Sequence, residues 1–261
     1  MLRGSRWPFF SAILITLALL AFACDNDGSG DSASLLPANG AGGVYLALGD
    51  SIAAGEGASD PDATSYVALV ADALRAESDG DLELQLLAVG GATTEDLIEK
   101  QVPAALDAIG EGDVRVVTIT IAGNDLNQLA GFPICQTNPA DPSCPIDDVL
   151  SDVEQRLDQA LTELESAAPD ATIAVQVYPN LFSGTGHMFE GQAEIAFELL
   201  NEVIAQVAAE HEVLLADPRA DFVGRGPDLT GLLDPEPDAH PNDAGYRVIA
   251  DAFLEVFGLA D

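Results

Sequence analysis

From Val44 onward, short apolar runs alternate with segments whose apolar residues recur every three or four positions. The apolar runs are bounded by turn residues, as is typical of strands buried on both faces of a sheet; they cover 44–48, 82–89, 114–121, 172–178 and 213–216. Helical periodicity is clearest from Ile146 to Leu164, from Ala196 to Val207 and from Ile249 to Val256. Strands interleaved with helices predict one α/β domain over 44–261, an α/β/α sandwich around a five-stranded parallel sheet.

The first 23 residues have a different pattern. Arg3 and Arg6 give a positive start, an uncharged apolar run extends from Trp7 to Ala23, and polar residues follow. This three-part layout is typical of a secretion signal, so we expect export to the cell envelope or the extracellular space. The sequence Leu-Ala-Phe-Ala-Cys at 20–24 resembles a bacterial lipoprotein signal, in which Cys24 would be lipidated. Ordinary secretion, with cleavage at the same bond, and an uncleaved anchor helix are the alternatives.

Residues 24–43 are rich in Asp, Ser, Gly and Ala and show no periodicity, which indicates a flexible acidic tether. Asp25, Asp27 and Ser29 are spaced like the first ligands of a calcium loop. Position twelve is Leu36, however, where such a loop needs a bidentate Glu, so a solvated spacer is the preferred interpretation. Contact with a membrane is expected only through a lipid anchor at Cys24.

Composition limits the partners. The 261 residues include 44 Asp and Glu but 9 Lys and Arg, a formal net charge of −35, and 48% are hydrophobic. That apolar content is enough for a core, while the negative surface repels phosphate backbones, so no nucleic-acid partner is expected. Three cysteines cannot form a disulfide scaffold and no Cys/His cluster has zinc spacing, so no metal or other cofactor is expected. Oligomeric state stays open.

Two of the cysteines, Cys135 and Cys144, flank a segment in which prolines block helix and sheet. Outside the cytoplasm, two cysteines that close a short loop are expected to form a disulfide, worth about 2–3 kcal/mol through restriction of the unfolded chain. Two free thiols are the alternative.

Candidate chemistry gathers at one place in the predicted sheet. Ligands of open parallel sheets bind beyond the carboxyl ends of the strands. Those ends carry Gly49-Asp50-Ser51, then Gly90-Gly91-Ala92, then Gly123-Asn124-Asp125, and then Pro179-Asn180. Taken singly, each segment has a purely structural interpretation, because Ser and Asn are good helix caps and a Gly pair suits a tight turn.

Taken together and in order, the segments resemble the sequence blocks of the GDSL, or SGNH, hydrolases. The matching blocks are Gly49-Asp50-Ser51 with Gly55 and Gly57, Ala88-Val89-Gly90-Gly91-Ala92-Thr93, Ala122-Gly123-Asn124-Asp125, and His240-Pro241-Asn242 with Gly245 and Tyr246. The resemblance covers almost all of the chain after the tether. It implies a flavodoxin-like fold and a serine hydrolase that cleaves carboxylic esters, of the lipase or acyl-esterase type.

The resemblance also implies roles for individual residues. Ser51 would be the nucleophile that forms an acyl-enzyme, and His240 the base that takes its proton. The oxyanion hole would consist of the backbone N–H groups of Ser51 and Gly91 and the side-chain amide of Asn124. Such an arrangement makes chemical sense, because a hydroxyl needs a base to become a nucleophile and the tetrahedral intermediate needs donors for its negative oxygen.

Two positions depart from the family pattern. Ala122 stands where the family usually has Gly, a change expected to affect local backbone room and to leave Asn124 in its role. The family acid usually lies three residues before the His, but that position is Pro237 here. Asp238, two residues before His240, is our candidate for orienting it. Asp234 and a backbone carbonyl are the alternatives.

The sequence has no Gly-x-Ser-x-Gly elbow and no Gly-rich phosphate loop, which disfavours α/β-hydrolases and nucleotide enzymes. The expected partner is a small-molecule ester. A carbohydrate O-deacetylase, a lysophospholipase and a thioesterase would fit the same machinery. A non-catalytic lipoprotein that binds a lipid or glycan is the alternative from another class. The physiological substrate and the preferred acyl length stay open.

Overall fold

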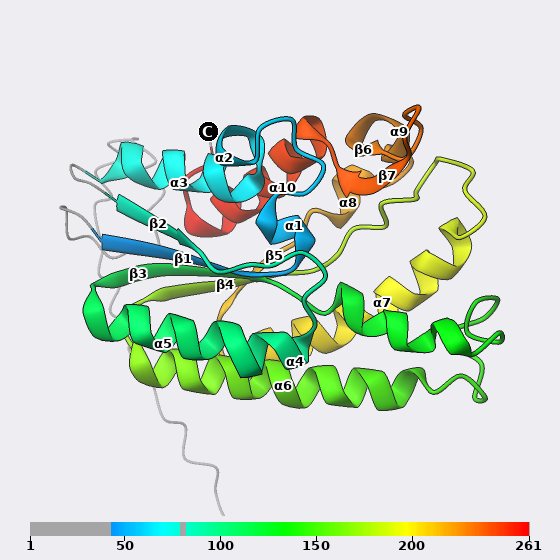
Figure 1. The fold of residues 1–261 in the computed structure, drawn as a ribbon, viewed down its shortest axis with the longest axis horizontal. Helices are drawn as coiled ribbons and strands as arrows, with labels where there is room; N and C mark the ends of the chain where they lie inside the picture. The colour runs from blue at the N-terminus through cyan, green and yellow to red at the C-terminus, as the bar shows by residue number, and fades with distance from the viewer. Residues whose placement is uncertain (1–42, 79–81, 261) are drawn as a thin grey trace, which may run out of the picture. The chain divides into compact units, whose positions relative to one another are not determined.

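A computed structural model describes residues 43–78 and 82–260 (Figure 1). The expected secretion signal, the lipidation candidate Cys24 and the tether up to residue 42 lie outside the described residues. Within the described ranges, we find no helix with the length and apolar character needed to cross a bilayer.

The central sheet has the five parallel strands that the apolar runs predict, in the order β2-β1-β3-β4-β5. Their bounds are β1 Gly43–Gly49, β2 Leu82–Leu86, β3 Val114–Thr120, β4 Thr172–Gln176 and β5 Leu214–Ala216. The run predicted over 82–89 is too long, because the chain leaves the ladder after Leu86. The amides of Leu87 and Ala88 both donate to the carbonyl of Ala47, at 2.8 and 3.1 Å. After this bend, Gly90 and Gly91 lie at the carboxyl edge of the sheet.

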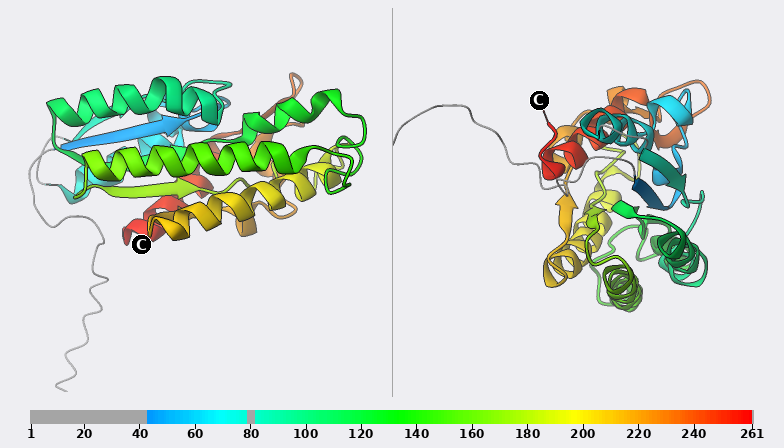
Figure 2. Two further views of the ribbon diagram at one scale, coloured as in Figure 1. Left: turned by 90° about the horizontal axis from the view of Figure 1, so that it is seen from below. Right: turned by 90° about the vertical axis from the view of Figure 1, so that its left-hand side faces the viewer.

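Helices cover both faces of the sheet, which confirms the predicted sandwich (Figures 1 and 2). One face carries α3 (Tyr66–Glu77) and α10 (Asp243–Phe257), and the other carries α5 (Val102–Glu111), α6 (Ile146–Ala167) and α7 (Glu190–Glu210). The shorter helical segments are α1 Ser51–Ala54, α2 Pro61–Thr64, α4 Thr94–Asp96, η1 Leu97–Gln101, η2 Gly123–Gly131, α8 Arg219–Phe222 and α9 Gly226–Leu229. A two-stranded antiparallel ladder joins β6 (Thr230–Gly231) to β7 (Asp238–Pro241).

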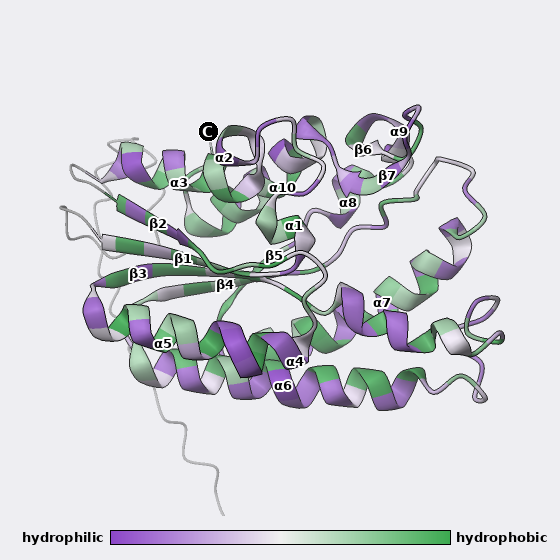
Figure 3. Cartoon of the chain, viewed as in Figure 1, coloured by the Kyte–Doolittle hydropathy of each residue, from purple (hydrophilic) through white to green (hydrophobic). Residues whose placement is uncertain are grey.

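The core follows from this layering. Strand residues from Val44 to Leu48 are almost fully buried, since helices cover both sides of β1. The long helix α6 alternates hydrophobic and hydrophilic patches (Figure 3), as expected of a helix with one face on a sheet. On the opposite face, the rings of Tyr66 and Phe253 stack at 4.9 Å and join α3 to α10. The helices therefore hold the strands rigidly beneath the polar segments at their carboxyl ends.

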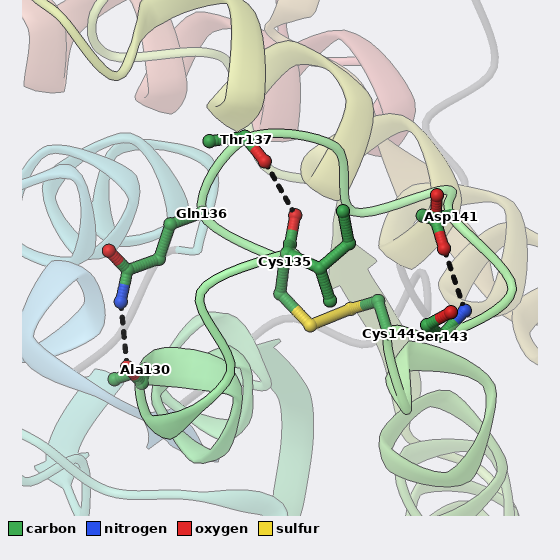
Figure 4. Close-up of a disulfide and its surroundings, with 8 residues drawn as sticks. Ala130, Cys135, Gln136, Thr137, Asp141, Ser143 and Cys144 are labelled. Carbon is green, nitrogen blue, oxygen red and sulfur yellow. Dashed lines mark hydrogen bonds between the residues drawn. A yellow bond between two sulfur atoms is a disulfide. The ribbon is translucent and has the colours of Figure 1, made fainter.

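Cys135 and Cys144 form a disulfide between η2 and α6, with nine residues of sequence separation (Figure 4). Both cysteines are buried. The loop they close has its own local bonds: Gln136 donates to the carbonyl of Ala130 at 2.7 Å, and the amide of Ser143 donates to Asp141 at 2.8 Å. The structure thus contains the disulfide that the sequence predicts.

Candidate active site

Ser51 lies at the first turn after β1, on the carboxyl edge of the sheet. The preceding residue, Asp50, caps α1 by accepting a hydrogen bond from the amide of Ile52 at 2.9 Å. A side chain at Gly49 would place its Cβ 2.1 Å from the carbonyl oxygen of Thr120, and φ is +142° there, so only glycine fits. The close approach of β1 to β3 and the cap together fix the turn that presents the Ser51 hydroxyl.

His240 reaches Ser51 from the other end of the chain. It lies on β7, and its Nε2 is 2.9 Å from Ser51 Oγ. Its Nδ1 is 2.6 Å from Oδ1 of Asp238. The same carboxylate oxygen accepts the backbone N–H of His240 at 3.0 Å. Because Asp238 makes a local turn onto the His240 backbone, a spacing of two residues suffices to reach the ring. Among the described residues Asp234 makes no hydrogen bond to His240; its amide donates to the carbonyl of Gly231.

The Asp238 carboxylate has the charge needed to orient an imidazole. Partial burial acts to raise its pKa, but the backbone and ring hydrogen bonds from His240, together with the charge of that ring, lower the pKa below its ordinary value. Asp238 is therefore ionised at neutral pH. An ionised acceptor at Nδ1 holds the imidazole proton there and leaves Nε2 free to accept a proton from Ser51.

The sequence predicts two backbone N–H groups and one side-chain amide as donors to the oxyanion. Gly91 has φ +79°, with no atom within 4 Å of a Cβ built on it, so the backbone conformation is what requires glycine there. Within the described ranges neither the Ser51 nor the Gly91 N–H donates to a protein acceptor. Asn124 is the second residue of η2, and its Nδ2 donates one hydrogen to the carbonyl of Ala92 at 3.0 Å. That bond fixes the amide, and among the described residues its second hydrogen meets no acceptor.

Asp125 joins the segments that carry these donors. Its fully buried carboxylate accepts from the amide and hydroxyl of Thr94, at 3.0 and 2.6 Å. Arg156 on α6 lies 3.8 Å away. Burial raises the pKa of Asp125 despite the Thr94 bonds and the Arg156 charge. The link ties the segment after Gly91 to η2, so Asp125 braces the segment that carries Asn124.

Ala122 adopts φ +102° and is completely buried. This is a left-handed conformation that side chains with a Cβ rarely adopt and that costs on the order of 1–2 kcal/mol. The sequence predicts that Ala122 changes the space around the backbone. The structure gives a more specific reason for the family's glycine, because the backbone at this position adopts a positive φ. The strain lies two residues before Asn124, which keeps its bond to Ala92.

Sequence reasoning missed Tyr178 near Ser51. Its hydroxyl donates to the Asp50 carboxylate, and its backbone N–H and C=O are both held by the Asn201 side chain at 2.8 Å. Burial raises the pKa of Asp50 to about 6, against the opposing hydrogen bonds from Tyr178 and Ile52. The sequence signal was its place at the end of the predicted strand 172–178, whose carboxyl end lies on the same edge of the sheet as Ser51.

Glu56 was also missed. Its Oε2 is 3.6 Å from Nε2 of His240, the nitrogen that faces Ser51. It lies inside the first sequence block, between Gly55 and Gly57. Nothing in the sequence linked that position to a residue 184 places further on, because the contact depends on how β7 packs over α1.

A parallel α/β sandwich with a hydrogen-bonded Ser, His and Asp at the carboxyl edge of its sheet has the arrangement of a serine hydrolase. Comparison with known proteins gives the family. The model of the GDSL-like Lipase/Acylhydrolase family matches residues 47–248. The chain belongs to this family and is a carboxylic ester hydrolase, as the sequence resemblance predicts.

Individual relatives agree. A lipase of Streptomyces rimosus is 30% identical over 233 residues, which cover 82% of this chain and 81% of the relative. The crystal structure of the extracellular lipase from Streptomyces rimosus superposes with a TM-score of 0.61 at 26% identity, over 84% of this chain and 99% of that one. Phospholipase A1 from Streptomyces albidoflavus NA297 gives a TM-score of 0.60 at 25% identity, over 82% and 97%.

Proposed function

We propose that the chain, through its domain at 44–261, hydrolyses acyl esters of the lipase or acyl-esterase type by way of an acyl-enzyme on Ser51. The observation that carries this proposal is the continuous hydrogen-bonded series from Ser51 Oγ to His240 Nε2 at 2.9 Å and from His240 Nδ1 to Asp238 at 2.6 Å. A nucleophile, a base and an orienting carboxylate in this order are what acyl transfer to water requires.

In the first step, Ser51 Oγ attacks the ester carbonyl while its proton passes to His240 Nε2. The carbonyl oxygen becomes an oxyanion, which the N–H groups of Ser51 and Gly91 and the Asn124 amide stabilise. Loss of one such donor commonly lowers the rate about 100- to 1000-fold. The bond to the alcohol then breaks, and His240 donates its proton to the departing oxygen. The Ser51 acyl ester remains.

In the second step, a water molecule gives a proton to His240 and attacks the acyl carbon. The carboxylic acid leaves, and the proton returns to Ser51 Oγ. Throughout, ionised Asp238 stabilises the imidazolium form of His240. No residue is oxidised or reduced, so the described side chains suffice for the whole cycle.

Apolar surface at the same edge supports an acyl substrate. Large apolar side chains are exposed at the end of β2 and on the segments that follow the strands: Leu86, Val89, Phe132, Met188, Phe189, Val223 and Leu233. A cavity of about 230 Å³ beside Gly91 is lined in part by Val89 and Ala92. The names of the relatives, a lipase and a phospholipase A1, support the same substrate class.

We also propose export, with a lipid anchor at Cys24. The apolar segment at 7–23 supports export, and so does the extracellular lipase among the relatives. Intact mass of the membrane-extracted protein tests the anchor, because a diacylglyceryl-modified Cys24 adds the mass of the lipid to a chain that begins at residue 24.

The activity is tested with p-nitrophenyl acetate, butyrate and octanoate, using the full-length chain and its Ser51→Ala variant. We expect turnover that disappears in the variant, and a rise in kcat/KM from acetate to octanoate. A fluorophosphonate probe should add one phosphonyl group to Ser51 in the wild type and none in Ser51→Ala. A wild type that neither turns over the esters nor takes up the probe contradicts the proposal, while a preference for acetate redirects it to the O-deacetylases.

A further inference from the structure

The carboxylate of Glu56 lies on the reactive side of His240. Its Oε2 is 3.6 Å from Nε2, while Asp238 binds Nδ1 on the opposite side of the ring. His240 therefore has an acidic group at each nitrogen. Asp238 is in hydrogen-bond contact with the ring, whereas Glu56 lies beyond hydrogen-bond distance, with half of its side chain exposed to solvent.

The backbone holds Glu56 firmly in this place. Its amide donates to the carbonyl of Ser51 at 2.9 Å, and its own carbonyl accepts the hydroxyl of Tyr246 at 2.5 Å. On its far side, Gly57 packs so closely that an added Cβ would lie 2.7 Å from the Cβ of His240. The side chain extends over Gly90, where a built Cβ would lie 1.8 Å from Oε1. The carboxylate thus lies between His240 and the glycine turn that carries Gly91.

This position coincides with the path of the leaving alcohol. His240 Nε2 must give its proton to the departing oxygen, which therefore lies within about 3 Å of that nitrogen. Since Glu56 Oε2 is 3.6 Å from the same nitrogen, oxygen and carboxylate are separated by less than about 7 Å. A group two carbons beyond the ester oxygen can then make contact with the carboxylate. Among the described residues no Lys or Arg forms an ion pair with Glu56, and Lys100, which lines the cavity beside Gly91, is paired with Asp96.

We propose that Glu56 determines specificity for the alcohol portion of the substrate and favours esters whose alcohol carries a cationic group, such as a quaternary ammonium. This inference rests on the proposed function, because it assumes that His240 protonates the leaving group. A carboxylate that is half exposed is partly screened by water, so we expect a preference of about tenfold in kcat/KM over an uncharged alcohol of equal shape.

The test compares acetylcholine with 3,3-dimethylbutyl acetate, its uncharged isostere, on the full-length chain. Wild type should prefer acetylcholine by about tenfold, Glu56→Gln should hydrolyse both about equally, and Glu56→Lys should reverse the preference. Asp62→Asn on α2 is the control, because it removes one exposed negative charge that forms no ion pair with His240 in the described part of the chain, and it should keep the wild-type preference. Circular dichroism verifies that each variant is folded.

The outcomes separate this inference from the proposed function. Equal turnover of the two acetates by wild type, or a preference that survives Glu56→Gln, overturns the role of Glu56 while leaving the esterase intact. An equal fall in kcat/KM for both substrates in Glu56→Gln also overturns the role of Glu56, because Glu56 would then stabilise the His240 imidazolium whatever the alcohol. Hydrolysis of p-nitrophenyl acetate without hydrolysis of acetylcholine overturns it as well. If wild type hydrolyses no ester and Ser51 takes up no phosphonate, the proposed function has failed and the inference with it.

Discussion

Replacing Asp238 with asparagine perturbs the orientation of His240 with almost no change of volume. The wild-type carboxylate accepts the ring Nδ1 proton at 2.6 Å, so Nε2 carries no proton and can act as a base. An asparagine amide can donate to Nδ1 instead, which moves the ring proton to Nε2. The base is then lost from the side that faces Ser51.

The magnitude has two parts. A hydrogen bond to a charged group contributes about 1.5–3 kcal/mol, or about 10- to 100-fold in rate, and the lower figure applies here because the Asp238 side chain is 45% exposed. The wrong tautomer adds a further loss, so kcat of Asp238→Asn should fall at least about 100-fold. Asp238→Ala should lose less, because water can accept the Nδ1 proton and restore the productive tautomer.

Steady-state kinetics with p-nitrophenyl butyrate measure this effect, with KM expected to change little because Asp238 does not face the ester. Asp234→Asn is the matched control and should stay within about twofold of wild type, within the range of surface substitutions. If Asp238→Asn keeps more than half of the wild-type kcat, Asp238 is not the orienting group. If Asp234→Asn is instead the damaging change, the alternative acid is correct.

Three further predictions concern stability. Ala122→Gly should stabilise the chain by about 1 kcal/mol, because the relief of left-handed strain at φ +102° outweighs the greater freedom of glycine in the unfolded state. Urea unfolding measures this change, and a loss of stability refutes the prediction. As the pH rises from 4 to 7, the free energy of unfolding of Asp50→Asn should increase relative to that of wild type, by up to about 3 kcal/mol. The reason is that the folded-state pKa of Asp50 is raised to about 6, so ionisation of Asp50 destabilises the folded wild type over that pH range. A difference in unfolding free energy that does not change with pH contradicts this assignment. Replacing Cys135 and Cys144 together with serine should lower the free energy of unfolding by about 2–3 kcal/mol, given the nine-residue separation, and an unchanged urea midpoint argues that the disulfide contributes nothing.

The strands and long helices could be predicted because their pattern is local. Unbroken apolar runs specify strands buried on both faces, and the recurrence from Ile146 to Leu164 specifies a helix with one apolar side. The end of β2 was misjudged because apolar character continues through Val89. The bond of Leu87 and Ala88 to the Ala47 carbonyl, which ends the ladder, is a tertiary contact.

The sequence by itself determined the fold class, the residue types available for catalysis and the edge of the sheet at which they gather, because periodicity and strand ends are properties of neighbouring residues. Only the tertiary structure decided which acid faces His240, since the sequence favoured Asp238 but left Asp234 and a backbone carbonyl open until the turn of β7 is built. The same holds for Tyr178 against Asp50 and for Glu56 at Nε2, contacts between segments more than 100 residues apart. Hydrogen bonds and charge interactions act over a few ångströms in space, and the packing of β7 and α1 at the edge of the sheet fixes those distances.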